Sequence, residues 1–158
     1  MRTRIALIAL ALAATGSLAA GPARLTLPGP AFPSFASPQA LEAACVRNIA
    51  TTLSAVRRLE RQPAGARWLA AYDDINALAE DLAGPVYLIS NVHPDKAVRD
   101  AAEACELKWQ DLFSTLGQNE ALFKAARQVK PRDAIDREFL KTTLEGFEDA
   151  GVSLPPDK

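Results

Sequence analysis

The chain has 158 residues, of which 49% are hydrophobic and 23% charged, and its formal net charge at pH 7 is −1. This apolar fraction is too high for a disordered chain, and the length suits one domain of ordinary size or part of a larger protein. The charge is nearly balanced and shows nothing like the clustered lysines and arginines of a nucleic-acid-binding face, so we expect no nucleic acid among its partners.

Residues 1–19 have the plan of a secretory signal peptide, with two arginines, the apolar run Ile5–Ala14 and then small residues. We expect cleavage after Ala19, because Ser17 and Ala19 then occupy the two small-residue positions; cleavage after Ala20 is the near alternative. An uncleaved anchor is less favoured, because a membrane span needs about 20 apolar residues. We therefore expect an exported protein, periplasmic or secreted, without membrane association after cleavage.

Residues 20–37 form a proline-rich segment that we expect to be extended or irregular. Proline lacks a backbone donor and has a fixed φ angle, so a segment with several prolines does not continue a helix or a central strand. A free linker has little use for two phenylalanines, so Phe32 and Phe35 are predicted to hold this segment against a helical body.

Residues 38–158 are predicted to be an all-α array of about five amphipathic helices with short connectors. Ser37 followed by Pro38 is a strong helix start, since serine caps the first free amides and proline fits the first turn. Apolar residues then recur in steps of three or four up to Leu59, and Gln62–Gly65 breaks the pattern.

A second helix is predicted from Trp68 to Leu82, and Gly84 with Pro85 is expected to end it. The apolar run Val86–Ile89 has residue types found in strands. The helical patterns on both sides nevertheless favour a short helical turn or a connector.

The third helix is expected to have Pro94 or Asp95 in its first turn and to carry an apolar stripe as far as Leu116. Asn119 is predicted to cap a fourth helix that reaches Val129.

Asp133, with Asp136 three residues later, resembles a capping arrangement at the start of the fifth helix. Ile135 is assigned to the apolar stripe of that helix. Gly151 is expected to be its left-handed stop, with Val152 folding back onto the last turn.

The only histidine, His93, lies in the stretch NVHPDKAVRDAAE, where a catalytic or ligand role competes with a simple helix opening. The sequence contains no H-E-x-x-H, C-x-x-C, G-x-S-x-G or phosphate-binding loop. Catalytic and metal sites need several cooperating groups, and one histidine does not supply them. We therefore assign no catalytic and no metal-binding residue in this chain.

Cys45 and Cys105 both fall on apolar stripes of predicted helices. They could form a disulfide between the first and third helices, which an exported location permits. They could instead stay two buried thiols that pack as small apolar residues. The sequence does not place the two backbones within bonding distance, so both alternatives stay open.

Aromatic and acidic residues on the predicted helices offer two weaker hypotheses. Trp68, Tyr72 and Trp109 could line a groove for a peptide, but aromatics at helical spacing are more often part of a core. The acids of the second helix are Asp73, Asp74, Glu80 and Asp81. Because a cation site needs a tight loop of oxygens, these acids are expected to form a solvated face.

Three segments in the second half of the chain are SNVHPDKAVRDAAEACE, NEALFKAARQV and DREFLKTTLEGFEDAGVSLPPDK. In order and spacing they resemble the N-terminal helical region of the thimet oligopeptidase and oligopeptidase A family of zinc metallopeptidases. The resemblance extends over roughly Leu41–Lys158.

The resemblance implies a zinc-dependent metalloendopeptidase that hydrolyses short peptides, with these helices forming one wall of a channel that excludes folded proteins. In the family, zinc is held by a later H-E-F-G-H helix and a downstream glutamate, and neither is in this sequence. We expect this chain alone to bind no zinc and to be inactive, its partners being short peptides or the missing catalytic region. The alternative is a stand-alone, non-catalytic helical module of the cell envelope that binds peptides or proteins.

Overall fold

The computed structural model describes residues 32–153, and this part of the chain is helical and contains no strand. Its five helices are α1 (Pro38–Leu59), α2 (Ala66–Val92), α3 (Lys96–Gly117), α4 (Glu120–Ala126) and α5 (Ala134–Asp149). The prediction of an all-α array of about five helices is confirmed for this range. The predicted signal peptide, its cleavage at Ala19 and most of the proline-rich segment lie outside the described residues.

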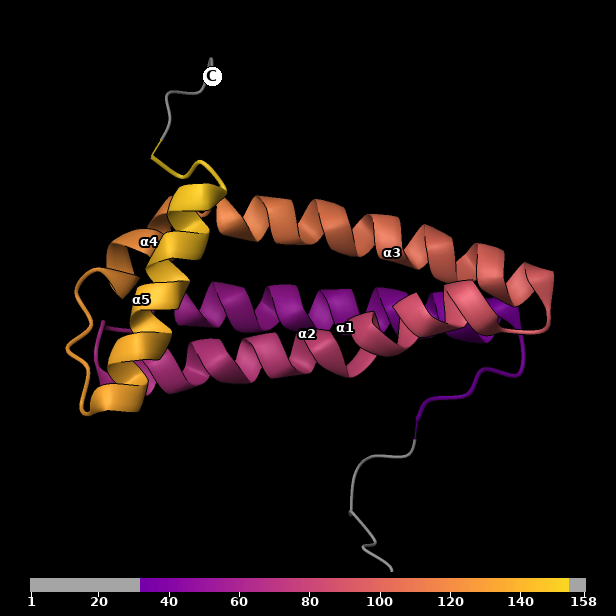
Figure 1. Ribbon diagram of the computed structural model, residues 1–158, viewed down its shortest axis with the longest axis horizontal. Coiled ribbons are helices and arrows are strands. Elements are labelled where there is room, and N and C mark those ends of the chain that lie inside the picture. The colour runs from indigo at the N-terminus through magenta and orange to yellow at the C-terminus, as the bar shows by residue number, and fades with distance from the viewer. Residues whose placement is uncertain (1–31, 154–158) are drawn as a thin grey trace, which may run out of the picture. The chain divides into compact units, whose positions relative to one another are not determined.

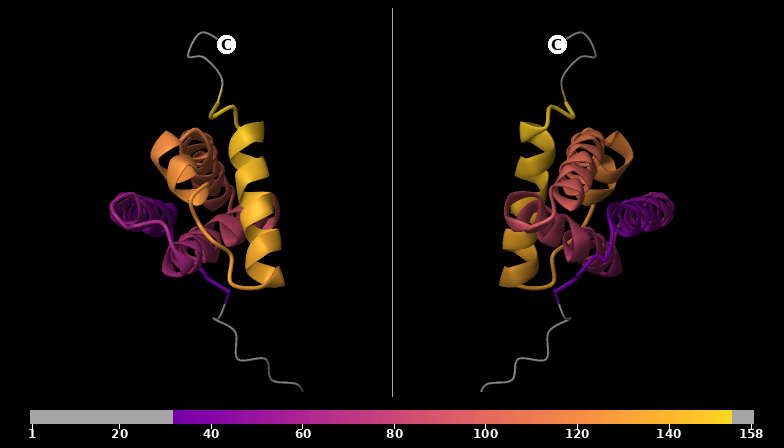
Figure 2. Two further views of the ribbon diagram at one scale, coloured as in Figure 1. Left: turned by 90° about the vertical axis from the view of Figure 1, so that its left-hand side faces the viewer. Right: turned by 90° about the vertical axis from the view of Figure 1, so that its right-hand side faces the viewer.

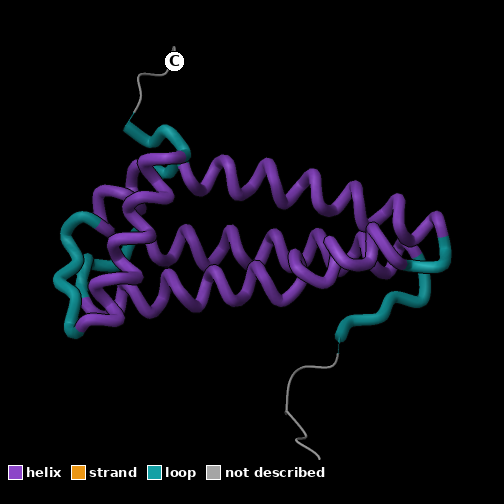
Figure 3. Tube along the Cα trace, in the orientation of Figure 1, coloured by secondary structure: helices purple, strands orange, loops and turns teal. Residues whose placement is uncertain are grey.

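The three long helices, α1, α2 and α3, run alongside one another, and each packs on the other two (Figure 1). Helix α5 crosses them near one end and also packs on the short helix α4 (Figure 1). In the end-on views, α1 and α5 lie on opposite sides of the α2–α3 pair (Figure 2). The loops gather at the two ends of the three long helices (Figure 3). Within the described residues, no helix has both the length and the hydropathy to cross a bilayer.

Side-chain caps begin four of the helices, and the caps predicted at Ser37, Asn119 and Asp133 are confirmed. Ser37 Oγ accepts a hydrogen bond from the amide of Ala40 at 3.2 Å. Each such bond satisfies one of the amides that lack a partner in the first turn. Asp95 caps α3 in the same way, so Pro94 precedes the helix instead of lying in its first turn, which corrects the predicted start.

The start of α5 has a second local interaction next to its cap. Asp133 Oδ1 accepts from the amide of Asp136 at 2.8 Å. The Asp136 carboxylate accepts from the backbone amide of Arg132, at 3.2 Å, and from its guanidinium, at 2.7 Å. Both bonds lower the pKa of Asp136, and the bond from the guanidinium has the larger effect. The arrangement resembles a capping box, except that the Asp136 side chain bonds to the amide of the residue before the cap and not to the amide of the cap itself.

Helix α5 ends at a glycine in the left-handed region, as predicted. Gly151 has a φ angle of 82°, which a residue with a Cβ adopts only with strain. The amide of Val152 then donates to the carbonyl of Phe147 at 3.1 Å, and the Val152 side chain is buried. This is the expected fold-back of the chain onto the last turn.

Helix α2 does not end at Gly84 and Pro85, as was predicted, but continues to Val92. A proline inside a helix removes one backbone hydrogen bond and costs about 3 kcal/mol. The next turns bury Val86 completely and Ile89 almost completely in the core, and this burial offsets the cost. The run from residue 86 to 89 is therefore part of α2, and neither a strand nor a connector.

Two apolar residues near the C-terminal end of the chain differ from the prediction. Helix α4 ends at Ala126, so Val129, although buried, lies beyond it. After Ala126 the amides of Gln128 and Val129 donate to the carbonyls three residues back, so the chain tightens into turns and the α-helix ends. Ile135 is 80% exposed, so the first turn of α5 is not covered and the residue does not join the core stripe.

The core consists of two clusters of buried side chains. One lies among α1, α2 and α3 and includes Leu41, Cys45, Val86, Ala102, Cys105 and Trp109. The other lies towards α4 and α5 and includes Leu59, Trp68, Leu122, Ala126, Phe147 and Val152. Trp68 and Trp109 are thus core residues, as predicted from their helical spacing.

The segment before α1 makes one of the two expected contacts. Residues 32–37 have no regular secondary structure, as predicted. Phe35 packs on the first core cluster, whereas Phe32 is 56% exposed. The expectation that both phenylalanines hold the segment is therefore right for Phe35 and wrong for Phe32.

A disulfide joins Cys45 on α1 to Cys105 on α3, with the two Cα atoms 6.0 Å apart. Both residues are buried in the first core cluster. Of the two alternatives left open by the sequence, the structure contains the cross-link and not a pair of free thiols. The bond connects two helices that already pack on each other.

Two helical glycines give a matched test of how closely α3 and α5 approach. A Cβ added at Gly117 would lie 2.6 Å from the Cβ of Ala150, whereas one at Gly146 meets nothing within 4 Å. We expect Gly117→Ala to lower the free energy of unfolding by about 1–3 kcal/mol through overpacking. Gly146→Ala should raise it by roughly 0.5–1 kcal/mol, because alanine favours the helix. Urea unfolding followed by circular dichroism measures both, and equal effects would contradict the close approach.

Candidate functional site

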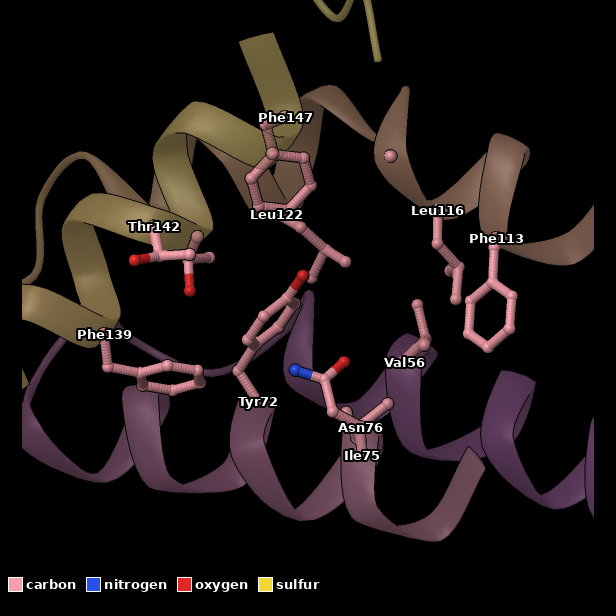
Figure 4. Close-up of a pocket in the computed structure, with 13 residues that line it drawn as sticks. Val56, Tyr72, Ile75, Asn76, Phe113, Leu116, Leu122, Phe139, Thr142 and Phe147 are labelled. Atoms are coloured by element: carbon pink, nitrogen blue, oxygen red, sulfur yellow. The ribbon is translucent and has the colours of Figure 1, made fainter. Parts of the chain in front are cut away.

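A pocket of about 310 Å³ lies between α5 and the other helices, and we call it the α5 pocket. Figure 4 shows its side chains meeting from opposite sides, with those of α2 facing those of α5. Its apolar lining includes Val56, Tyr72, Ile75, Leu122, Phe139 and Phe147. Most drug-sized ligand sites have a similar plan, an apolar wall with a few polar groups.

Helical spacing explains how each helix contributes its share of the wall. On α2, Tyr72, Ile75 and Asn76 are three and four residues apart and therefore share one face. On α5, Phe139 and Thr143 are related by the same spacing. The pocket therefore depends on two faces that come together only when α5 packs across the long helices.

Tyr72 stands at the centre of an aromatic group in the pocket wall. Its ring stacks on buried Trp68 with 5.5 Å between centroids and is tilted against Phe139 and Phe147 at 6.4 and 6.0 Å. Burial raises the pKa of the Tyr72 phenol above its usual value of 10.0. The phenol is therefore neutral at physiological pH and can both donate and accept a hydrogen bond.

The polar groups of the α5 pocket are uncharged. They are the Tyr72 phenol, the Asn76 amide and the hydroxyls of Thr142 and Thr143. The Thr142 hydroxyl already donates to the carbonyl of Glu138 at 3.0 Å within α5. Because no charged side chain of the described residues lines this pocket, it suits an apolar side chain with a peptide amide beside it, and not a phosphate or a metal ion.

His93 has a local structural role at the junction of α2 and α3. Its Nδ1 accepts a hydrogen bond from the amide of Asp95 at 3.2 Å, and its carbonyl accepts from the guanidinium of Arg99. These contacts connect the end of one helix to the start of the next. His93 does not line the α5 pocket; it is the C-terminal cap of α2, and the next helix begins at Lys96 with Asp95 as its cap.

The zinc that the resemblance implies does not fit the described residues. Among residues 32–153, no group of three or more histidine, cysteine, aspartate or glutamate side chains is placed to hold a metal ion. The acids of α2 are all exposed, which confirms the predicted solvated face; they are Asp73, Asp74, Glu80 and Asp81.

Comparison of the chain with protein-family models, with characterised proteins and with solved structures finds no match. Function is therefore inferred from the motifs and from the pocket. Among the residues that line the pocket, only Tyr72 is a candidate for ligand binding from the sequence alone. Phe139 and Phe147 lie eight residues apart, which is a helical spacing, and nothing in that spacing distinguishes a pocket wall from a filled core. Thr142 and Asn76 gave no signal, because isolated polar residues on a helix are ordinary.

Proposed function

We propose that this chain is the N-terminal helical part of an exported zinc-dependent oligopeptidase and that it forms part of the wall along which short peptides bind. Two features support the proposal. The three ordered segments that end in DREFLKTTLEGFEDAGVSLPPDK resemble the helical region of that family. The all-helical fold of residues 32–153 is compatible with such a wall. The catalytic zinc motif belongs, in this proposal, to a region outside these residues.

The α5 pocket is the observation that carries the binding role. A leucine or phenylalanine side chain moved from water into such a pocket gains about 1.5–3 kcal/mol. That gain is modest, and it suits a substrate that has to leave again after hydrolysis. The Tyr72 phenol and the Asn76 amide lie at the same pocket, where they can form hydrogen bonds with the backbone of the bound peptide.

The purified chain should not hydrolyse peptides by itself, because its sequence contains no H-E-x-x-H motif. We expect a quenched fluorogenic peptide of about ten residues to be cleaved no faster with the chain than in buffer, with or without added zinc. The control is a complete zinc peptidase assayed with the same substrate. Hydrolysis by the chain that phenanthroline abolishes and zinc restores would contradict this assignment.

The second candidate is a stand-alone, non-catalytic module that binds peptides or proteins in the cell envelope. Its supporting observation is that both core clusters, and the disulfide between α1 and α3, are made within residues 32–153. Copurification from the source cells distinguishes the two candidates. A polypeptide with H-E-x-x-H, in the same chain or stably bound to it, supports the oligopeptidase, and its absence supports the module.

A further inference from the structure

A second hollow lies between α2 and α3, beside the proline inside α2, and we call it the α2–α3 groove. It measures about 350 Å³, and its lining includes Glu80, Gly84, Tyr87, Glu106, Trp109 and Phe113. Phe113 also lines the α5 pocket, so the two hollows meet at this side chain. A ligand longer than one residue can therefore occupy both.

The groove is negatively charged. Glu80 and Glu106 are its charged side chains, and no lysine, arginine or histidine of the described residues lines either hollow. Carboxylates beside apolar walls concentrate a negative potential that attracts a cation. The groove differs in this respect from the α5 pocket, whose lining residues are uncharged.

Two residues that line the groove each have a buried polar atom without a partner. Oε1 of Glu106 and Nε1 of Trp109 are both buried, and neither forms a hydrogen bond within the described part of the chain. A buried polar atom without a partner costs about 1–3 kcal/mol, and more if it is charged. A side-chain rotation that turned either atom into the groove would let a bound cation or carbonyl supply the missing partner.

Exposed aromatic rings stand next to these acids. Tyr87 is 66% exposed and Phe113 is 39% exposed, which is high for large apolar side chains. A guanidinium group can stack on an aromatic face while its N–H groups pair with a carboxylate. The groove therefore suits arginine in particular.

The distance between the two hollows sets the spacing of the ligand. Asn76 lines the α5 pocket and Glu80 lines the groove. Four helical residues rise about 6 Å, and an extended peptide covers this distance in about two residues, at roughly 3.3–3.6 Å each. Residues two apart in an extended chain point to the same side, so both side chains can face the protein.

We propose that the α5 pocket and the α2–α3 groove together bind an extended peptide that carries a large apolar side chain and, two residues away, an arginine. The proposal rests on the proposed function, because it specifies the class of peptide that this wall takes. The apolar side chain enters the pocket, and the guanidinium pairs with Glu80 and Glu106.

The test uses labelled peptides and fluorescence anisotropy. Each peptide is acetylated, has phenylalanine and arginine two residues apart with one alanine between them, and is made in both chain orders. The matched peptides carry citrulline, which keeps the shape of arginine without its charge. At low ionic strength we expect the better arginine peptide to bind roughly tenfold more tightly than its citrulline analogue, as expected for a charge-assisted pair.

Protein variants assign that difference to the groove. In the double variant Glu80→Gln/Glu106→Gln, the arginine and citrulline peptides should bind within about twofold of each other, because the charge-assisted pairs are lost. Glu42→Gln, which removes an exposed acid on α1 outside both hollows, should keep the tenfold preference. Circular dichroism checks that each variant is folded.

Two results would overturn the proposal. One is equal binding of arginine and citrulline peptides to the unmodified protein, and the other is no saturable binding of either peptide. Equal binding that Thr142→Phe abolishes, by filling the α5 pocket, refutes the cation site but leaves the apolar pocket as a peptide site. Failure of the proposed function is separate, because it appears as missing peptidase activity in the native protein and not in these titrations.

Discussion

Replacing both cysteines of the disulfide, in Cys45→Ala/Cys105→Ala, should lower the free energy of unfolding by about 4 kcal/mol. The two residues are 60 apart in sequence, so the cross-link removes a long loop from the unfolded ensemble. For a domain of this size, we expect the midpoint of thermal unfolding to fall by roughly 10–20 °C. Urea titration followed by circular dichroism at 222 nm measures the change.

The matched control for the disulfide separates the cross-link from its packing. Wild-type protein treated with reductant under denaturing conditions keeps both sulfur atoms but loses the bond. We expect it to show most of the destabilisation, with the alanine variant slightly less stable because two buried side chains are also truncated. An unchanged urea midpoint after verified reduction would show that the bond contributes nothing to this fold.

Truncating the tryptophan of the second core cluster, in Trp68→Ala, should lower the free energy of unfolding by about 3–5 kcal/mol. Trp68 is 0% exposed, and its ring supports Tyr72 in the wall of the α5 pocket. The variant should therefore also lose affinity for peptides that use this pocket. Chemical unfolding measures the first effect and fluorescence anisotropy with the labelled peptides measures the second.

Trp68→Phe is the control for that prediction. Phenylalanine keeps an aromatic ring against Tyr72, and it removes the buried Nε1, which has no hydrogen-bond partner within the described residues. The lost volume is thus partly offset by the loss of an unpaired donor, and we expect a cost of about 1–2 kcal/mol. If Trp68→Ala were as stable as Trp68→Phe, the ring would not support the pocket wall as we describe.

The features that the sequence predicts well are the ones made by neighbouring residues. Ser37, Asn119 and Asp133 cap helices through bonds to amides three residues ahead, and Gly151 stops α5 through its own backbone freedom. Such interactions need no information about the rest of the fold, because both partners lie within one turn.

The features that escape prediction depend on packing between distant segments. Helix α2 continues past Pro85 because Val86 and Ile89 are buried against other helices. The helix propensity of the local residues does not include the free energy of that burial. The distance between Cys45 and Cys105 is likewise a result of how α1 packs on α3.

The candidate site is harder to predict than the fold for the same reason. The α5 pocket exists only where α5 crosses α2, and the α2–α3 groove only where Glu80 and Glu106 face one hollow from two helices. On the sequence, Glu80 belongs to an ordinary solvated face and Glu106 to the polar side of the next helix. Their shared surroundings become visible only in three dimensions.

The most direct test of the proposed function is the activity of the native protein. The polypeptide that contains residues 38–153 is purified from its source cells under mild conditions, identified by mass spectrometry and assayed with a quenched fluorogenic peptide. We expect hydrolysis that phenanthroline abolishes and zinc restores, together with an H-E-x-x-H segment in the same or a tightly bound chain. Native material that contains no such segment and cleaves the peptide no faster than its phenanthroline-treated sample would contradict the assignment to a zinc oligopeptidase.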